Sequence, residues 1–300
     1  MGDHTYRSLK YALCVLLASL AAALVVIPVS AQQAPTTTLV GAGDIADCGN
    51  RRDEATANLV KRIPGTVFTL GDNVYPDGTA GEFANCYNPS WGQFKARTRP
   101  TPGNHEYYST GTRPYYNYFR ARAGIPSRGY YSYDRGSWHI IALNSNCDKV
   151  GGCGVNSSQG RWLRQDLANN PSRCTLAYFH HPLFAPGGKT ESTAVRPFWR
   201  TLYDRGADVI LSGHAHRYER FIPQTPTGAR DLSRGIREFI VGTGGKPPEG
   251  PINGTAPNSV VKNDKTPGVL KLNLGAGSYT WKFVNIPGTT FTDSGTGRCH

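Results

Sequence analysis

Residues 66–75 read Thr-Val-Phe-Thr-Leu-Gly-Asp-Asn-Val-Tyr, and this stretch decides the fold. Thr66–Leu70 is a short run of β-branched, aromatic and aliphatic residues, which is typical of a buried strand. A glycine and then Asp72 follow it directly, so an acidic side chain stands where the strand ends. Thr38–Gly43 followed by Asp44 repeats this arrangement. We therefore expect a sheet of buried strands with polar residues at their carboxyl ends.

Strand-like and helical segments alternate along the chain outside this stretch. Short apolar runs predict strands, and amphipathic runs predict helices. The strands expected are Ser137–Asn144, Thr175–Phe179 and Asp208–Ser212, and the helices expected are Asp53–Arg62, Gln159–Asn169 and Ala194–Arg205. This alternation indicates an α/β fold. His139, inside the first of these strands, is interpreted as a packed core residue.

The C-terminal third of the chain changes character. The strands expected there are Glu238–Gly242, Gly268–Asn273 and Ser278–Val284, joined by turns rich in Gly and Pro. From them we expect a second, more antiparallel sheet. Two segments rich in Tyr, Gly, Pro and Asn, 107–129 and 245–267, are interpreted as long loops, and long loops in compact domains are usually functional or disordered.

The composition is that of an ordinary globular protein. The 300 residues are 38% hydrophobic and 18% charged, with 35 Gly and 21 Pro. These values exclude a collagen, a coiled coil and a wholly disordered chain, and they favour short strands and turns over a helical bundle. The formal net charge of +12 predicts anionic substrates or anionic surfaces as partners, with dispersed, solvated arginines as the alternative. No specific nucleic-acid partner is predicted.

The first residues of the chain have the order of a secretory signal peptide. Arg7 and Lys10 precede an uncharged run, Tyr11–Val29, and small residues follow it up to Ala31. An uncleaved membrane anchor is the alternative, since the run is just long enough to span a bilayer. The small residues that close the run favour cleavage. We therefore predict that residues 1–31 are a signal peptide and that the protein is secreted or periplasmic, with no stable membrane span after processing.

Six cysteines remain once that segment is set aside, and an even number in an exported chain predicts disulfides. Spacing supports one pairing, Cys147 with Cys153, which would close a small Gly-rich loop. The pairing of the other four stays open: Cys48, Cys86, Cys174 and Cys299. No C-x-x-C pair occurs, so neither a thiolate zinc site nor a thioredoxin-like redox centre is expected.

Five blocks of metal-competent side chains stand at or just beyond expected strand ends. They are Gly43-Asp44, Gly71-Asp72, Asn104-His105-Glu106, His180-His181 and His214-Ala215-His216. An α/β sheet places its ligand crevice outside the carboxyl ends of its strands. A single Gly-Asp is more often an ordinary turn, but carboxylates, an amide oxygen and three imidazoles together form the donor set of borderline metal ions. The five blocks therefore predict a site for a pair of metal ions.

In this order the blocks GD, GDNVY, GNHE, FHHP and GHAH resemble the calcineurin-like metallophosphoesterases, and within them the purple acid phosphatases. The resemblance covers residues 38–245 and includes the glycine-rich segment 241–245. It implies an α/β fold in which two sheets form a βαβαβ sandwich flanked by helices, with the metal site at the carboxyl ends of the strands. It also implies that residues 32–300 are a single catalytic domain, without the extra β domain that plant members carry before theirs.

The resemblance implies two ligand sets that share one carboxylate. The first metal would be bound by Asp44, Asp72, Tyr75 and His216, and the second by Asp72, Asn104, His180 and His214. Two metal cofactors are therefore expected, with ferric iron at the first set and a divalent zinc, iron or manganese ion at the second.

Two details of the motifs bear on this assignment. His180 is preferred to His181 as the ligand because the family's histidine stands two residues before a proline, here Pro182. His181 would then lie beside the site or at the surface. The purple acid branch is favoured by Ala46, which stands where many wider relatives carry a metal-binding histidine, and by Tyr75, whose counterpart in that branch binds ferric iron. An ordinary loop tyrosine is the alternative for Tyr75.

These residues imply hydrolysis of phosphate monoesters, with a metal-bound hydroxide as the nucleophile. Asn104 and His105 would bind the substrate, and His105 would donate a proton or hydrogen bond to the leaving oxygen while Glu106 orients its ring. Simple support of the ligand loop is the alternative for His105 and Glu106. The expected partner is a small phosphorylated molecule. The alternative functions are a phosphodiesterase or nucleotidase on the same metal core and a non-catalytic anion-binding module.

Overall fold

The computed structural model describes Met1 and residues 36–109, 111–186, 192–248, 250 and 254–300. The signal peptide predicted for residues 1–31 lies, apart from Met1, outside the described residues. Ala34–His300 forms one compact unit. Within the described ranges, no helix combines the length and the apolar composition that a membrane crossing requires.

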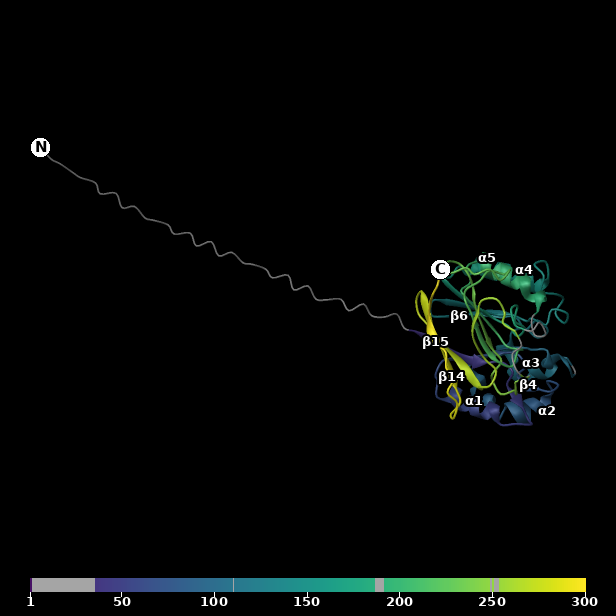
Figure 1. Ribbon diagram of the computed structural model, residues 1–300. Helices are drawn as coiled ribbons and strands as arrows, with labels where there is room; N and C mark the ends of the chain where they lie inside the picture. The colour runs from purple at the N-terminus through teal and green to yellow at the C-terminus, as the bar shows by residue number, and fades with distance from the viewer. Residues whose placement is uncertain (2–35, 110, 187–191, 249, 251–253) are drawn as a thin grey trace. The chain divides into compact units, whose positions relative to one another are not determined.

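The compact unit is built on two large sheets, and the first has the strand order β15-β14-β13-β1-β3-β5 (Figure 1). Its strands are β1 (Thr37–Ala42), β3 (Thr66–Leu70), β5 (Thr98–Thr101), β13 (Gly268–Leu274), β14 (Ser278–Asn285) and β15 (Ser294–Arg298). β1, β3 and β5 are parallel, whereas β13 is antiparallel to β1. The parallel strands thus bring their carboxyl ends to one edge of this sheet.

The second sheet has the strand order β12-β10-β11-β9-β8-β7-β6. Its strands are β6 (Tyr131–Arg135), β7 (Trp138–Ala142), β8 (Cys174–Tyr178), β9 (Val209–Ser212), β10 (Tyr218–Phe221), β11 (Arg237–Val241) and β12 (Ser259–Asn263). β7, β8, β9 and β11 are parallel. A separate short pair, β2 (Ala46–Asp47) and β4 (Val74–Tyr75), joins the two loops that follow β1 and β3.

The helices lie outside the two sheets, with α4 and α5 on one side and α1 and α2 on the other (Figure 1). The α-helices are α1 (Arg52–Lys61), α2 (Ala80–Glu82), α3 (Arg113–Phe119), α4 (Ser158–Asn169) and α5 (Arg196–Asp204). A π-helical turn η1 (Phe83–Tyr87) and the 3₁₀ turns η2 (Trp91–Arg97), η3 (His105–Tyr107), η4 (Arg120–Ala123) and η5 (Thr193–Val195) complete the helical elements of the described residues. The predicted α/β sandwich flanked by helices is confirmed.

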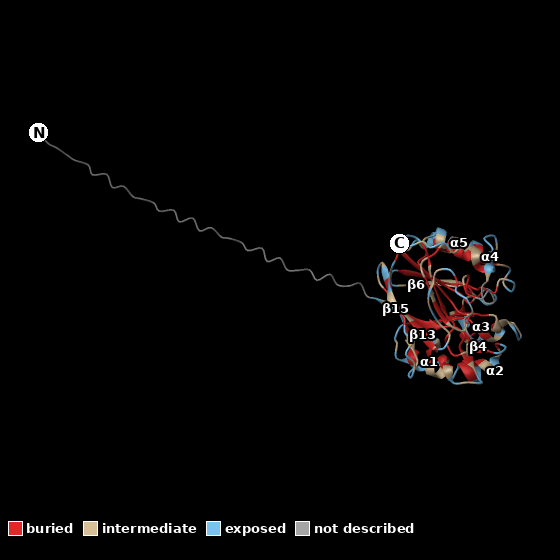
Figure 2. Cartoon of the chain, in the orientation of Figure 1, coloured by how far each residue is buried: buried red, intermediate tan, exposed pale blue. Residues whose placement is uncertain are grey.

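Strand β8 explains how the layers hold together. The strands between the two groups of helices are largely buried (Figure 2), and all five residues of β8 are buried. Successive side chains along a strand point to opposite faces. Leu176 and Tyr178 join the core between the sheets, while Ala177 joins the core beneath α4 and α5 with Leu163 and Trp199. A strand covered on both faces has no solvent-facing side, which is why its sequence, Cys-Thr-Leu-Ala-Tyr, contains no charged residue.

The expectation of a second, separate antiparallel sheet in the C-terminal third is wrong. β13, β14 and β15 extend the first sheet, whereas β11 runs parallel to β9 in the second. The physical reason is that β1 has one edge free for pairing, and β13 supplies the buried Val269, Leu270 and Leu272 that cover the same core. The segments 107–129 and 245–267 are also not loops throughout, because α3 lies in the first and β12 in the second.

Three disulfides link the described cysteines. Cys147–Cys153, the pairing predicted from spacing, is confirmed. The cysteines left open pair as Cys48–Cys86 and Cys174–Cys299. The last of these attaches the end of the chain to β8 in the second sheet.

Candidate metal centre

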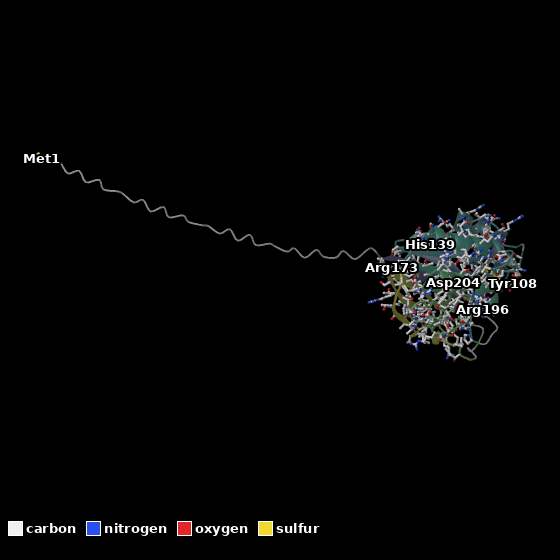
Figure 3. The ribbon with its side chains drawn as sticks, turned by 90° about the horizontal axis from the view of Figure 1, so that it is seen from above. Met1, Tyr108, His139, Arg173, Arg196 and Asp204 are labelled. Atoms are coloured by element: carbon white, nitrogen blue, oxygen red, sulfur yellow. A yellow bond between two sulfur atoms is a disulfide. The ribbon has the colours of Figure 1, made fainter. Side chains whose placement is uncertain are left out.

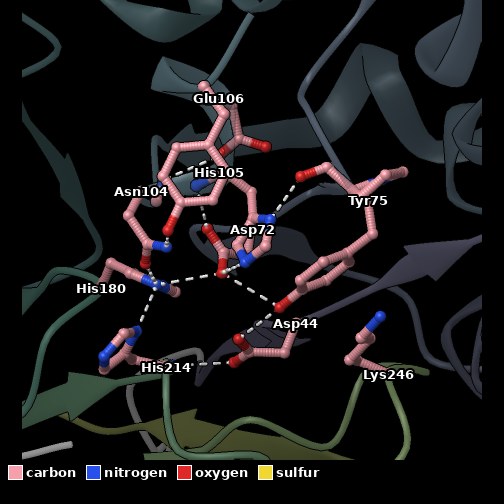
Figure 4. Close-up of polar contacts among 12 residues, drawn as sticks. Asp44, Asp72, Tyr75, Asn104, His105, Glu106, His180, His214 and Lys246 are labelled. Carbon is pink, nitrogen blue, oxygen red and sulfur yellow. Dashed lines mark hydrogen bonds and ion pairs between the residues drawn. The ribbon is translucent and has the colours of Figure 1, made fainter.

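The predicted ligands converge at one end of the sandwich, where strands of both sheets finish (Figure 4). Asp44 follows β1 and Asp72 follows β3 in the first sheet, and Asn104 follows β5. His180 follows β8 and His214 follows β9 in the second sheet. The two sheets therefore contribute different chemistry, oxygens from the first and imidazoles from the second, to one place.

The backbone at this place is strained in a way that aims side chains inward. Asp44, Asp72 and His214 have φ values of 58°, 46° and 68°, although none of them is a glycine. Non-glycine residues in this region are uncommon, and such residues cluster at functional sites. Gly71, with φ 81°, packs so closely that a Cβ there would lie 2.6 Å from Nδ1 of His180. The turns after the strands are thus shaped for close approach of donor atoms.

The first group of donors surrounds the hydroxyl of Tyr75. This hydroxyl lies 2.8 Å from Oδ1 of Asp44, 3.0 Å from Oδ2 of Asp72 and 3.3 Å from Nε2 of His216. Nε2 of His216 is also 3.5 Å from Oδ1 of Asp44. Four side chains predicted to share one metal therefore meet within hydrogen-bonding range or just beyond it.

The second group surrounds Nε2 of His180. This nitrogen lies 3.0 Å from Oδ1 of Asn104, 3.1 Å from Nδ1 of His214 and 3.3 Å from Oδ2 of Asp72. Asp72 belongs to both groups and is nearly fully buried. It therefore stands where a carboxylate bridging two cations has to stand.

Backbone carbonyls determine which ring nitrogen of His180 and of His216 faces the metal centre. Nδ1 of His180 lies 2.7 Å from the carbonyl oxygen of Leu70, and Nδ1 of His216 lies 3.0 Å from that of Pro247. A carbonyl can only accept, so each Nδ1 carries the proton and donates it. Burial lowers the pKa of His180, but the Asp72 carboxylate outweighs burial and raises it to about 9, so the Nε2 lone pair is free for a cation only once this ring loses its second proton. A ring whose Nδ1 donates to a carbonyl and whose Nε2 faces other donor atoms is typical of metal-binding histidines. The donor set fits a pair of cations.

The ionisation of the buried oxygens supports the same conclusion. Burial, together with the carboxylates of Asp44 and Asp72, raises the pKa of the Tyr75 hydroxyl well above its usual 10. Burial also raises the pKa of Asp44. Burial opposes ionisation of Asp72 as well, but the neighbouring His180 holds the pKa of that carboxyl well below its usual range. A tyrosinate at this position therefore needs a strongly charged cation among these oxygens.

His105 stands at the open side of the metal centre, between two tyrosines. Its ring centroid lies 4.4 Å from that of Tyr75 and 4.6 Å from that of Tyr108. Its backbone N–H donates to Oδ1 of Asp72 at 2.9 Å, and its Nε2 lies 3.8 Å from Oδ2 of the same residue. The side chain keeps 23% of its surface exposed. It is held in place and still reaches solvent.

The expectation that Glu106 orients the ring of His105 is wrong. Nδ1 of His105 contacts the carbonyl of Pro76 instead. The fully buried carboxyl of Glu106 accepts hydrogen bonds from the backbone N–H groups of Gly103 at 2.6 Å and Asn73 at 2.7 Å. Burial and the charge of Asp72 raise the pKa of Glu106 to about 8. Glu106 therefore joins the loop after β3 to the loop after β5.

His181 lies beside the metal centre, and one of its ring nitrogens belongs with His180 and His214 to a group that could hold a metal ion. Its Nδ1 lies 2.8 Å from the hydroxyl of Ser145, and its ring centroid is 4.5 Å from that of His214. Its ring nitrogens group with those of His180 and His214 within 4.8 Å. Burial, followed by the charge of His180, lowers the pKa of His181 well below its usual value, so this ring is neutral.

Two contacts at the metal centre were not predicted from the sequence. The Lys246 ammonium lies 4.5 Å from the centroid of the Tyr75 ring and 2.8 Å from Oδ2 of Asp47. The Tyr108 hydroxyl accepts a hydrogen bond from Nδ2 of Asn104 at 2.6 Å, which turns Oδ1 of Asn104 toward His180. Lys246 comes directly after the glycine-rich segment 241–245, and that adjacency is the signal that could have found it. No signal in the sequence marks Tyr108 among sixteen tyrosines.

Comparison with known proteins agrees with this geometry. The family model described as calcineurin-like phosphoesterase matches residues 32–218. The chain belongs to the calcineurin-like phosphoesterase family. The predicted ligands up to His216 lie inside the matched range, as do the two sheets' parallel cores up to β9. The family resemblance inferred from the five motif blocks is confirmed.

The curated relatives that this chain matches include purple acid phosphatases. The chain is 31% identical over 165 residues to probable purple acid phosphatase 20 of Arabidopsis thaliana, covering 46% of this chain and 38% of that protein. It is 25% identical over 232 residues to purple acid phosphatase 15 of the same plant, covering 64% and 42%. The chain thus spans about two fifths of the length of these relatives.

Solved phosphoesterase structures share the fold. Purple acid phosphatase PPD1 from yellow lupin superposes with a TM-score of 0.67 at 20% identity, over 88% of this chain and 54% of that one. A structure of PhoD superposes with a TM-score of 0.61 at 12% identity, over 89% of this chain and 70% of that one. At these identities the likeness establishes the α/β sandwich.

Proposed function

We propose that this protein is an exported, dinuclear metal-dependent phosphatase that hydrolyses phosphate monoesters. The observation that carries the proposal is the orientation of His180 and His216: their Nδ1 atoms donate to carbonyls, and each Nε2 faces one of the two groups of donor atoms that Asp72 connects. The first proposed ligand set is Asp44, Asp72, Tyr75 and His216, and the second is Asp72, Asn104, His180 and His214.

The two sets differ in the cation that suits them. We assign ferric iron to the first set, because the counterpart of Tyr75 in the purple acid phosphatases binds ferric iron. The second set offers neutral imidazoles and an amide oxygen, which suit divalent zinc, iron or manganese. When bound, the two ions supply Lewis acidity toward a phosphoryl oxygen and lower the pKa of bound water.

The chain's own residues supply the rest of the mechanism. His105 is placed to bind the phosphoryl group and to donate a proton to the leaving oxygen, since its ring is fixed between two tyrosines, its Nε2 lies beside the Asp72 carboxylate, and its side chain still reaches solvent. Asn104 presents Oδ1 inward because Tyr108 accepts from its Nδ2. Glu106 acts through the backbone of Gly103 and Asn73, and it is therefore a positioning residue.

The organic part of the substrate has a place beside the metal centre. A cavity of about 440 Å³ borders Asn104 and His181 and is lined further by Tyr107, Tyr108 and Lys149. A cavity of this size accepts a small organic group, and aromatic walls with a few polar groups are typical of ligand sites. The same cavity supports the second candidate, a phosphodiesterase or nucleotidase, because it could equally seat the second ester group or a base.

Hydrolysis of two esters with a shared leaving group tests the reaction. We expect purified protein to cleave p-nitrophenyl phosphate with a kcat/KM at least tenfold above that for bis(p-nitrophenyl) phosphate. Activity should disappear after prolonged chelation and return with ferric iron plus zinc, and elemental analysis should give about two metal ions per chain. A preference for the diester would replace the monoesterase by the second candidate. Full activity after complete metal removal would overturn the metal mechanism itself.

Export is tested separately. The order of residues 1–31 supports a cleaved signal peptide, with residues 32–300 as one catalytic domain. Expression of the full chain in a secreting host should release a protein whose N-terminal residue is Gln32 and whose mass is that of residues 32–300. Recovery of the uncleaved chain in the membrane fraction would favour the anchor instead.

A further inference from the structure

A second cavity opens where each large sheet ends on an edge strand. β5 is the last strand of the first sheet and β6 the last strand of the second. The Tyr131 hydroxyl on β6 donates to the carbonyl of Pro100 on β5 at 2.8 Å, which joins the two edges. The Tyr178 hydroxyl on β8 donates to the carbonyl of Arg99 at 3.0 Å, which attaches β5 further to the second sheet. The turn η4 (Arg120–Ala123) lies beside β5 and completes a cavity of about 540 Å³.

Three of the residues that line this cavity are arginines, Arg99, Arg120 and Arg122. Among the described residues, no ion pair or hydrogen bond joins any of the three to a carboxylate. The contact made by Arg99 is with the ring of Tyr133, 5.5 Å from its centroid. Like charges gathered in one concave place without counter-charges create a strong positive potential there.

The nearest carboxylates on this edge serve another group. Asp134 belongs to β6 and Asp166 to α4, and each lies 2.8 Å from a ring nitrogen of His139. Ser132 also donates to Asp166. Asp134 alternates along β6 with Tyr131 and Tyr133, so its side chain points to the opposite face of the strand from the two tyrosine rings. The positive charge of the cavity is therefore not neutralised from β6.

The backbone of Arg120 gives an independent reason to regard the cavity as functional. Arg120 follows α3 with φ 55° and ψ −139°, a conformation that glycine adopts readily and that a side chain with a Cβ resists. Helices commonly end on a glycine for this reason. An arginine kept at such a position is strained, and strained residues concentrate at binding sites. Its side chain lines the cavity.

The size and walls of the cavity restrict the ligand. A volume of about 540 Å³ suits a small molecule rather than a polymer that runs across a surface. The Tyr131 hydroxyl is already bonded to Pro100, and that of Tyr133 lies 3.3 Å from the Tyr178 hydroxyl. The rings thus form an inner wall, and the polar recognition comes from guanidinium groups, which pair with phosphate and sulfate oxygens in a bidentate way.

This cavity is separate from the metal centre. Arg99 lies near the start of β5, whereas Asn104 lies beyond its end, and no residue that lines the cavity belongs to either ligand set. We propose that the cavity lined by Arg99, Arg120 and Arg122 is a second anion site, which binds a compact soluble molecule with two or more phosphate or sulfate groups. It needs no metal and is independent of the proposed hydrolysis.

Calorimetric titration with inositol hexasulfate tests this site on the metal-loaded protein at 0.1 M salt. This probe carries sulfate esters instead of phosphate esters, so it has the negative charge that the site should bind but is not a phosphatase substrate. We expect one molecule to bind per chain, and the double variant Arg120→Gln, Arg122→Gln to bind at least tenfold more weakly. The matched control is Arg200→Gln, Arg205→Gln on and just after α5, which removes the same charge elsewhere and should change the affinity less than twofold. Both double variants should retain wild-type turnover of p-nitrophenyl phosphate.

Arg120→Gly separates binding from folding. Glycine relieves the positive φ, so this variant should melt at a higher temperature than the wild type while its affinity for inositol hexasulfate falls. The proposal is overturned if the wild-type protein binds no inositol hexasulfate, or if the α5 control loses as much affinity as the Arg120→Gln, Arg122→Gln variant. It is also overturned if orthophosphate displaces the probe at the same concentrations at which it inhibits turnover, because the probe would then be bound at the metal centre. Binding only to vesicles containing 10% anionic lipid, with none to the soluble probe, would point to a membrane surface and would also overturn it.

Discussion

Two places in this molecule set histidine against carboxylates, and they serve opposite purposes. At the metal centre, Nδ1 of His180 donates to a backbone carbonyl, so its Nε2 faces Asp72 and two further donor atoms (Figure 4). At the second place, which we term the His139 clamp, His139 lies between Asp134 and Asp166, with one carboxylate 2.8 Å from each ring nitrogen. His139 lies apart from Tyr108 of the metal centre (Figure 3).

The difference teaches that residue types alone do not define a metal site. In the His139 clamp every ring nitrogen has its own acceptor, so a protonated imidazolium satisfies the group completely. At the metal centre several acceptors crowd round one nitrogen, and a single proton cannot satisfy them all. The expectation that His139 is simply a packed core residue is therefore incomplete: it is buried, with 2% of its surface exposed, but it is held by ion pairs that join β6, β7 and α4.

The largest effect is expected from a substitution at the metal centre. Asp72→Asn removes the carboxylate that both donor groups share. We expect kcat/KM for p-nitrophenyl phosphate to fall by about 10³-fold or more, since charge stabilisation by metal ions contributes several kcal/mol. Elemental analysis should show fewer than two metals per chain.

Asp77→Asn is the matched control for that prediction. Asp77 is exposed and lies five residues further along the same loop. It should keep both metals and wild-type turnover. Two full equivalents of metal in Asp72→Asn would show that the shared carboxylate is not a ligand.

An intermediate effect is expected at the His139 clamp and concerns stability. Burial lowers the pKa of His139, but the hydrogen bonds with Asp166 and Asp134 outweigh it, and the net pKa is raised above its usual 6.5. A raised folded pKa stabilises the protein fully below the unfolded value and loses that contribution as the pH rises through the folded value. His139→Gln should therefore lower the free energy of unfolding by about 1–3 kcal/mol at pH 5.5, and by less at pH 10.

Urea unfolding of wild type and His139→Gln at the two pH values measures this difference. Because Asp134 is largely exposed, most of the effect should come from the Asp166 side. Metal content and turnover at pH 7 should be unchanged. A stability difference that grows with pH would contradict the protonated clamp.

The smallest effect is expected at Lys246, beside the metal centre. Lys246→Met removes the ammonium that lies over the Tyr75 ring. A nearby positive charge lowers the energy of electrons on a tyrosinate. With the proposed ferric ion bound to Tyr75, loss of the ammonium should move the visible tyrosinate-to-iron absorption to longer wavelength by a few per cent of its energy.

Lys246→Arg should keep the wild-type absorption maximum. Asp47→Asn breaks the other contact of Lys246 while keeping its charge, and it should shift the band less than Lys246→Met does. An unchanged band in Lys246→Met would mean that the ammonium has no electronic influence on Tyr75.

Local patterns were sufficient for much of the fold. The predicted helix Asp53–Arg62 is displaced by one residue from α1, and the strand Thr66–Leu70 matches β3. Both are set by short-range periodicity that needs no knowledge of neighbours. The partner of β13 could not be predicted in this way, because β-pairing depends on which edge the rest of the fold leaves free.

The sequence by itself determined which side chains stand at the ends of which strands, and with them the family and the predicted ligands. It could do so because each motif is local: a buried run, a turn and a polar residue. The tertiary structure alone decided that Glu106 acts on backbone rather than on His105, that Lys246 lies over Tyr75, and that three arginines gather between two sheet edges. Apart from the hydrogen bond between Glu106 and Gly103, these contacts join segments that are separated in the chain, and their distances are set by the packing of the two sheets.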